Sequence, residues 1–163
     1  MKQLLLCRHA KSSWKHNVED LYRPLNARGL RQAPRIAQTL TFKPELIICS
    51  PAIRAYATAL AYCHELHWDP QDININQQLY EAGLTQLLKI LKDIPDKCDS
   101  VMLIGHNPGF NQLLSYLAPD NDIDNVVTSA RVDITLEIET WRMIDQSCGT
   151  VSDITTPLSL GLH

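Results

Sequence analysis

The chain lacks the features that mark membrane, secreted and nucleic-acid-binding proteins. No apolar stretch approaches the ~18 residues that a membrane span needs. The apolar run near the N-terminus is interrupted by Arg8, which makes it too short for the core of a signal peptide. Acidic residues outnumber basic ones by 18 to 15, and the basic residues are scattered, which argues against a general surface for polyanions. We therefore expect a cytoplasmic protein without a membrane or nucleic-acid partner.

Paired cysteines and clustered metal ligands are also missing. The five cysteines are odd in number and include no C-x-x-C pair, so neither a disulfide framework nor a zinc site is indicated. His64 and His67 lie three residues apart on a predicted helix, but no third ligand accompanies them. Surface histidines are the simpler interpretation, and we expect no metal or other cofactor.

What the chain does have is the composition of one ordinary globular domain, residues 1–163. Hydrophobic residues make up 45% of it and charged residues 20%, and no repeat, linker or low-complexity stretch divides it. A chain of this length can bury roughly 70% of the surface that its unfolded form exposes, which suffices for one core.

Strand and helix signals alternate along most of the chain. Short apolar runs at residues 3–7, 46–49 and 101–104 are typical of buried parallel strands. A helical pattern follows each run. Ser50-Pro51 and Asn107-Pro108 predict helix starts, with a capping residue before a proline in the first turn. Residues 29–41 and 84–91 also read as helices, the first kinked or late-starting because of Pro34.

From Arg131 to Ile144 the apolar period changes to two. The pattern predicts a terminal antiparallel hairpin, with Trp141 and Met143 in its second strand and a tail after Ile154. Together, these signals predict an α/β fold, a three-layer sandwich with a mostly parallel central sheet and helices on both faces.

Four basic side chains fall where such a sheet binds its ligands, beyond the carboxyl ends of the strands. Arg8 and His9 end the first strand, Arg54 lies one turn into the helix after the second, and His106 follows the third. Crowding this much positive charge without carboxylate partners is costly. A bound anion would neutralise these charges and remove the repulsion between them.

Phosphoryl transfer suits these residue types. The transferring group carries charge on its equatorial oxygens, which arginine forks and helix N-termini neutralise. A nucleophilic imidazole must be neutral, so we expect a hydrogen bond to fix its other nitrogen, while the second histidine stays protonated as a clamp. We predict His9 as the nucleophile and His106 as the clamp.

The segments LLLCRHAKSSW, CSPAIRAYATA and LIGHNPGF resemble the Arg-His, Ser-Pro-x-x-Arg-x-x-x-Thr and Gly-His signatures of the histidine phosphatase superfamily. The similarity extends from residue 4 to about residue 118. It is closest to the short SixA-type phosphohistidine phosphatases, because Ala10 stands where most of the superfamily has glycine and YRPLNARG resembles their arginine-proline-leucine segment. The resemblance implies His9 as the phosphorylated residue, Arg8 and Arg54 as phosphate ligands, and His106 as the second histidine of the site.

Glu81 lies where many superfamily members keep the acid that protonates the leaving group, although SixA-type members often lack one there. A solvated loop carboxylate is the alternative. Arg23 and Arg28 either line the substrate approach, as the resemblance suggests, or solvate a loop. For Trp14 we expect a packing role rather than a stacking platform, and strand alternation places Cys7 in the core, opposite to Arg8.

These observations lead to one main hypothesis, a metal-independent phosphatase that acts on phosphohistidine in a signalling or phosphotransfer protein. A phosphomonoesterase for a small phosphorylated substrate, with Glu81 as the acid, is the second. A phosphoglycerate mutase is less favoured because the chain lacks insertions that could close over the site. The alternative from another class is a phospho-ligand binding module without turnover.

Overall fold

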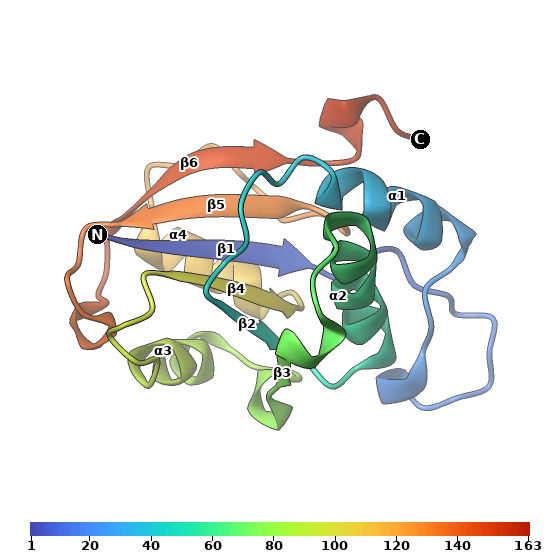
Figure 1. Cartoon of the computed structure of the whole chain (residues 1–163), viewed down its shortest axis with the longest axis horizontal. Helices are drawn as coiled ribbons and strands as arrows, with labels where there is room; N and C mark the ends of the chain where they lie inside the picture. Colours follow the sequence, from blue (N-terminus) through green and yellow to red (C-terminus); the bar gives the residue numbers. More distant parts are fainter.

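Six strands form one sheet with helices packed on both faces, in a computed structural model that describes all residues 1–163 (Figure 1). The strands are β1 (Lys2–Arg8), β2 (Leu46–Cys49), β3 (Ile73–Ile75), β4 (Ser100–Gly105), β5 (Arg131–Leu136) and β6 (Gly149–Thr155). The helices are α1 (Ala27–Ala37), α2 (Ile53–Leu66), α3 (Leu84–Lys92) and α4 (Gly109–Leu117).

The sheet is parallel except at one side. Its strand order is β3-β2-β4-β1-β5-β6, and β5 runs antiparallel to both β1 and β6. The predicted α/β class, with a mostly parallel sheet and a late antiparallel pair, is therefore confirmed.

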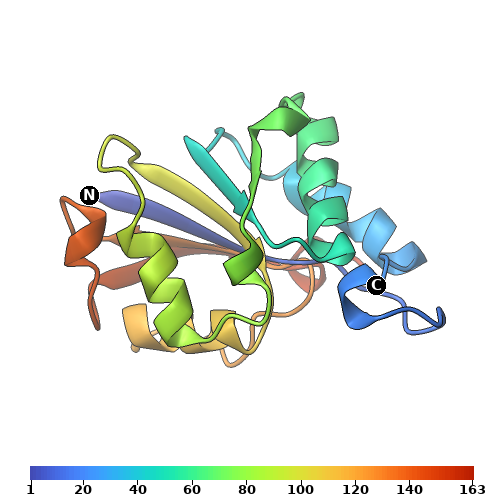
Figure 2. The same cartoon turned by 90° about the horizontal axis from the view of Figure 1, so that it is seen from below.

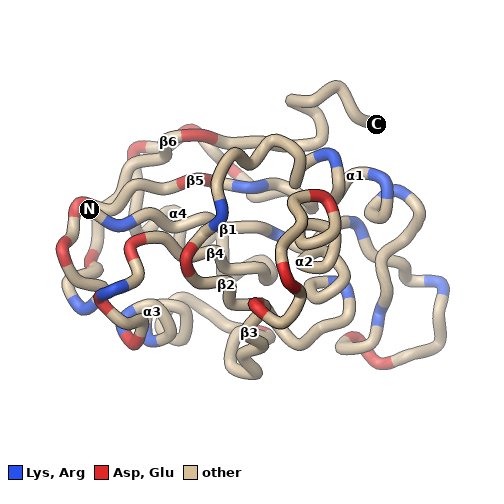
Figure 3. Tube along the Cα trace, viewed as in Figure 1, with Lys and Arg blue, Asp and Glu red and all other residues tan.

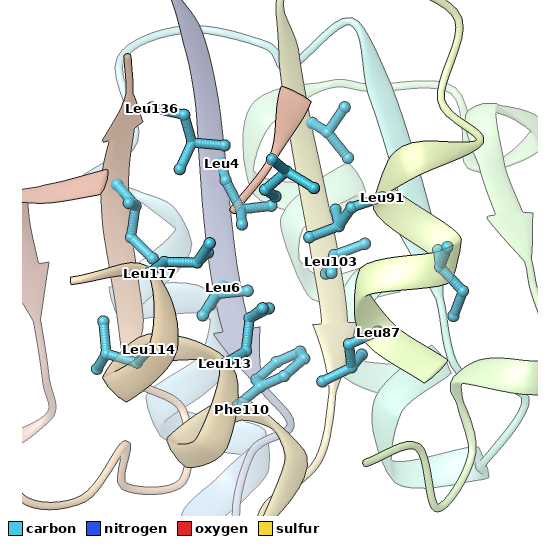
Figure 4. Close-up of a cluster of buried hydrophobic side chains, with 14 of the residues drawn as sticks. Leu4, Leu6, Leu87, Leu91, Leu103, Phe110, Leu113, Leu114, Leu117 and Leu136 are labelled. Atoms are coloured by element: carbon cyan, nitrogen blue, oxygen red, sulfur yellow. The ribbon is translucent and has the colours of Figure 1, made fainter. Parts of the chain in front are cut away.

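Both faces of the central strands are buried, which explains their continuous apolar runs. In β1, Leu4 and Leu6 belong to the core under α3 and α4, whereas Leu5 and Cys7 belong to the core under α1 and α2. Figure 2 shows the two helix layers on opposite sides of the sheet, and Figure 4 shows the leucines of the α3–α4 side. Cys7 is thus in the core, as predicted, and burial raises the pKa of its thiol to about 12.

The second strand of the terminal pair was predicted in the wrong place. Residues 141–143 form a short 3-10 helix, and the partner of β5 is β6, which begins at Gly149. The apolar residue that suggested a strand, Trp141, is fully buried for another reason, because its indole N–H donates a hydrogen bond to the Cys98 carbonyl (2.8 Å).

Three helix starts also differ from expectation. Helix α1 begins at Ala27, capped by Asn26, and continues through Pro34, so it does not start late. Helix α2 begins at Ile53, three residues after the expected cap Ser50, and helix α4 begins at Gly109, two residues after the expected cap Asn107, which leaves the two prolines outside the regular helices. The Ser50 side chain nevertheless accepts a hydrogen bond from the Ala52 N–H (3.2 Å), as a capping serine does, and it has a second partner, described below. The short edge strand β3 was not predicted at all, and the expected tail contains a single 3-10 turn at Leu158–Leu160.

No helix of this structure combines the length and the apolar character needed to cross a membrane. All five cysteines are free thiols. No three His, Cys, Asp or Glu side chains cluster in a way that could hold a metal ion.

Gly29 fixes how the loop after β1 meets α1. Its N–H donates to the Asn26 side chain (2.8 Å), and the Asn26 N–H donates to the Lys11 carbonyl (3.0 Å). A Cβ atom on Gly29 would lie 2.2 Å from that same carbonyl oxygen. Because the obstructing atom belongs to a hydrogen-bonded backbone, it cannot rotate away as a side chain would.

We predict that Gly29→Ala destabilises the protein, although alanine is favoured over glycine inside helices by ~1 kcal/mol. The clash should outweigh that gain and lower the free energy of unfolding by about 1–3 kcal/mol, as overpacking does elsewhere. Urea denaturation measures the change. Leu30→Ala, at the neighbouring 62% exposed position of the same helix, is the control and should be close to neutral. A Gly29→Ala protein more stable than the parent would contradict the steric argument.

Candidate active site

Strand register brings the two predicted histidines together. Arg8 of β1 pairs with Gly105 of β4, and Cys49 of β2 pairs with Ile104 of β4, so all three strands end at the same level. The His9 N–H donates to the Gly105 carbonyl (3.1 Å). The centroids of the His9 and His106 rings lie 5.2 Å apart, so the two imidazoles face one site.

The His9 ring is held in one tautomer. Its Nδ1 lies 2.8 Å from the Ala10 carbonyl oxygen, which can only accept, so Nδ1 carries the proton. The Ala10 N–H donates to Thr58 Oγ1 (2.9 Å), which fixes this carbonyl against α2. In the neutral ring, the lone pair is therefore on Nε2, as the predicted nucleophile requires.

Burial and positive neighbours keep His9 neutral. Burial is the larger cause and, with the charges of Arg54, Arg8 and Arg23, it lowers the pKa of His9 to about 4, against the opposing effect of the Ala10 hydrogen bond. At neutral pH the ring is uncharged.

His106 is fixed by a residue whose role was predicted differently. Its Nε2 lies 2.6 Å from Ser50 Oγ, the side chain expected to cap α2. When Ser50 donates its hydroxyl proton to Nε2, the neutral ring carries its own proton on Nδ1, a buried nitrogen without a partner. Burial first, then the positive charges of the site, lowers the pKa of His106 to about 3. The expected protonated clamp is therefore wrong for the protein alone, in which His106 is a neutral donor.

Arg54 is buried, and its position depends on a carboxylate that the sequence did not reveal. Its Nη1 donates to the Asp20 carbonyl (2.7 Å) and its Nη2 to Asp20 Oδ2 (3.0 Å). Asp20 also accepts from the Tyr80 hydroxyl and from Arg23 Nε. These donors, Tyr80 foremost, hold the pKa of Asp20 well below its usual range, so the carboxylate stays charged.

The expectation that the arginines have no carboxylate partner is thus wrong for Arg54. Asp20 occupies the 3-10 segment Asp20–Tyr22, far from any strand end, which is why the strand-end rule missed it. Its spacing of three residues from Arg23 was the one available signal. Tyr80 was missed as well, although its ring packs edge-on against His106, with centroids 5.7 Å apart.

Arg8 reaches across the site from β1. Its Nη1 donates to the Val126 carbonyl (3.0 Å), in the segment that leads into β5. Burial, followed by the charge of Arg54, lowers the pKa of Arg8. The charge of Arg54 thus acts on Arg8, as expected for two guanidinium groups that belong to one cluster.

Three buried N–H groups of the site have no partner in the protein: Arg8 Nε, Arg54 Nε and His106 Nδ1. Buried donors are almost always paired, so three unpaired ones within one cluster call for an explanation. A tetrahedral oxyanion would supply the acceptors and offset the repulsion between the arginines.

Of the remaining predicted residues, Arg23 is buried beside the cluster, whereas Arg28 and Glu81 are exposed. Arg23 is 7% exposed and donates to Ser12 Oγ (2.7 Å) as well as to Asp20, so it does more than solvate a loop. Arg28 is exposed on α1. Glu81 is exposed, has a positive φ of 58°, and makes no hydrogen bond or ion pair. The structure therefore does not bring the Glu81 carboxylate into the cluster.

Trp14 is not the packing residue that we expected. Its side chain is 76% exposed, and the Arg23 guanidinium lies 3.4 Å from the centroid of its ring. His64 and His67 are both exposed on or next to α2.

Comparisons with known proteins agree with this geometry. The model of the histidine phosphatase superfamily (branch 1) matches residues 4–102. An uncharacterized protein of Mycobacterium tuberculosis is 28% identical over 123 residues, which cover 74% of this chain and 75% of its own.

Two solved structures illustrate the likeness of fold. A candidate phosphohistidine phosphatase SixA from Agrobacterium tumefaciens is 26% identical, with a TM-score of 0.77 over 96% of this chain and 99% of that one. The protein histidine phosphatase SixA in complex with tungstate is 24% identical, with a TM-score of 0.80 over 97% of this chain and 99% of that one.

We predict that both site histidines titrate well below the usual value near 6.5, with midpoints near pH 4 for His9 and pH 3 for His106. NMR titration of the imidazole Cε1–H signals, assigned with His9→Ala and His106→Ala, measures this. Orthophosphate should raise both midpoints, because an adjacent anion stabilises the imidazolium. Midpoints near 6.5 would contradict the burial argument, and midpoints unmoved by phosphate would place the anion elsewhere.

Proposed function

Because the chain belongs to the histidine phosphatase superfamily, we propose that it is a phosphatase that transfers a phosphoryl group first to His9 and then to water. We further propose that its substrate is phosphohistidine in a signalling or phosphotransfer protein of the cytoplasm. The observation that carries the proposal is the hydrogen bond from His9 Nδ1 to the Ala10 carbonyl, because it leaves Nε2 as a free nucleophile among cationic groups.

In the first step, the Nε2 lone pair of His9 attacks phosphorus. The bond between phosphorus and the leaving imidazole nitrogen breaks, and its electron pair stays with the leaving ring, which solvent has protonated on its other nitrogen and which therefore departs as neutral imidazole. Arg8, Arg54 and His106 supply N–H donors to the equatorial oxygens as their charge shifts. The arginines provide the positive charge that a metal ion provides in other phosphatases, so this mechanism needs no metal.

In the second step, a water oxygen attacks the phosphorus of phospho-His9. The bond from phosphorus to Nε2 breaks, its electron pair returns to the ring, and orthophosphate leaves with both protons of the water, one of which it can pass to solvent. The ring keeps its orientation throughout, since the Ala10 carbonyl holds Nδ1–H in both steps.

The position of Glu81 favours phosphohistidine over alkyl or aryl esters. An alkoxide needs a proton as it leaves, whereas imidazole leaves readily near neutral pH, because its conjugate acid has a pKa of about 6.5. The exposed, unpaired Glu81 is not placed against the cluster, and a substrate that needs no acid fits that arrangement. A solved protein of the same fold holds tungstate, a tetrahedral oxyanion, which supports an oxyanion site here.

A phosphomonoesterase for a small substrate is the second candidate function. Glu81 directly follows Tyr80, whose ring contacts His106, so a modest backbone change would bring the carboxylate toward the site. The positive φ of Glu81 shows that this backbone is held in an unusual conformation.

His9→Ala should lower phosphohistidine hydrolysis by about three orders of magnitude or more, as loss of a covalent nucleophile does. Hydrolysis of a phosphohistidine peptide measures it. A short incubation with a radiolabelled substrate should also place stoichiometric, acid-labile phosphate on the parent protein and none on the variant.

The matched control is His64→Ala, at an exposed histidine outside the site, which should keep full activity and labelling. Appreciable turnover by His9→Ala would remove His9 from the nucleophile role. Label that persists without release in the parent protein would indicate a binding module without turnover.

Glu81→Gln distinguishes the two candidate substrates. On a phosphohistidine peptide, we expect the rate to change less than about twofold, because the leaving imidazole needs no acid. On an aryl phosphate, loss of a general acid should cost about 100-fold or more if the second candidate is correct. Rates of the variant and the parent on both substrates decide the matter, and equal large losses on both would contradict the preference for phosphohistidine.

A further inference from the structure

A cleft of about 730 Å³ lies between the loop that follows β1 and the start of α1. Five basic side chains line it, and no Asp or Glu does. The basic residues are Lys11, Lys15, His16, Arg28 and Arg31, and the exposed Trp14 joins them. In Figure 3, the basic stretches of α1 and of the loop after β1 lie at the same end of the molecule. We call this surface the basic cleft.

The charges of the basic cleft are not neutralised by the protein. Its four Lys and Arg residues are all exposed, and none forms a salt bridge. The chain as a whole has a net charge of −3 and only 15 Lys and Arg residues, so this local excess is a departure from the rest of the surface. An acidic partner would be attracted here and repelled elsewhere.

The basic cleft is tied to the active site without being part of it. It shares no lining residue with the cluster of Arg8, His9, Arg54 and His106. Lys11 follows His9 by two residues, and the floor residues Ser12 and Ser13 accept hydrogen bonds from Arg23. Arg23 in turn binds Asp20, which holds Arg54. A chain lying in the cleft would therefore sit beside the site of phosphoryl transfer.

The spread of the charges indicates what kind of ligand fits. The cations come from two elements, one at each wall, and all of them are exposed. A single phosphate ion would leave most of these cations without an anionic partner. Several carboxylates along a polypeptide would match them, and Trp14 offers the same segment an apolar surface.

We propose that the basic cleft docks an acidic segment of the phosphohistidine-carrying protein and so selects substrates by the charge around their phosphohistidine. This inference rests on the proposed function, since the docked segment must belong to the molecule whose phosphoryl group reaches His9. Exposed charge pairs are individually weak, so several acting together should give a preference of about tenfold at low ionic strength.

The test uses synthetic peptides that carry the same phosphohistidine and differ only in whether the flanking residues are Glu, Gln or Lys. For the parent protein, kcat/KM should be about tenfold higher for the Glu peptide than for the Gln peptide at low salt. This preference should vanish at about 1 M salt, where the Debye length is roughly 3 Å. Phosphoramidate, which has no flanking chain, should be hydrolysed with little dependence on charge reversal in the cleft.

The variant Lys15→Glu/Arg31→Glu reverses one charge on each wall of the cleft. It should abolish or invert the preference for Glu over Gln and leave phosphoramidate hydrolysis within about twofold of the parent. Lys89→Glu/Lys92→Glu is the matched control, because it reverses two exposed charges on α3, on the opposite face of the sheet. The control should keep the full preference.

Equal rates on the Glu and Gln peptides in the parent protein, or a preference that survives Lys15→Glu/Arg31→Glu, would overturn the docking proposal. Failure of the proposed function looks different, since then neither the peptides nor phosphoramidate is hydrolysed. Docking can still be judged in that case by fluorescence anisotropy of the labelled, unphosphorylated Glu peptide, whose binding must weaken in the cleft variant. A single-stranded oligonucleotide that binds the cleft more tightly than the Glu peptide would assign it to nucleic acid and overturn the proposal.

Discussion

The in-register ending of three parallel strands is the constraint on which the site depends. Because β4 pairs with β1 on one side and with β2 on the other, the residues after each strand meet at one edge of the sheet. His9, Ser50 and His106 are therefore neighbours, although they come from distant parts of the sequence. Their backbones are fixed by strand hydrogen bonds, and a shift of one residue in β4 would separate the two imidazoles.

Around this edge, positively charged side chains outnumber negatively charged ones, and their mutual repulsion is unfavourable. Arg8, Arg23 and Arg54 lie around the imidazole pair of the buried His9 and the partly buried His106, and Asp20 is the one carboxylate bound among them. Neutral histidines are the result, because protonating either ring would add charge to an already cationic, poorly hydrated region. In the proposed function, the same arrangement would prepare the cluster for a phosphoryl group, which brings negative charge to the arginines. Affinity for an oxyanion and a free nucleophile would then have a common physical origin.

The sequence predicted the strands whose side chains are buried on both faces and failed for the exposed edge strand. Strands β1, β2 and β4 are covered on both faces, so their apolar runs were unambiguous. Strand β6 lies at an edge and is mostly exposed, so its sequence GTVSDIT gave a weak signal, and the buried Trp141 drew the prediction away from it.

Within the site, too, the residues predicted from the sequence are those that local patterns place. The strand-end rule located all four residues Arg8, His9, Arg54 and His106. Asp20 and Tyr80 come from irregular segments whose approach to the site depends on tertiary packing, which no local pattern records. The hydroxyl of Ser50 was recognised as a cap and does accept from the Ala52 N–H, but its contact with His106 was missed, because capping is the commoner role for a serine before a helix.

The position of β1 between β4 and β5 has a consequence for synthesis of the chain. The Arg8 guanidinium and the backbone around His9 are bound by Val126, Ser129 and Ala130, near the late strand β5. A nascent polypeptide that has emerged only as far as α4 already contains both histidines but lacks the segment before β5 that orients Arg8. In the proposed mechanism, competence for phosphoryl transfer is therefore acquired at the end of translation, when β5 pairs with β1.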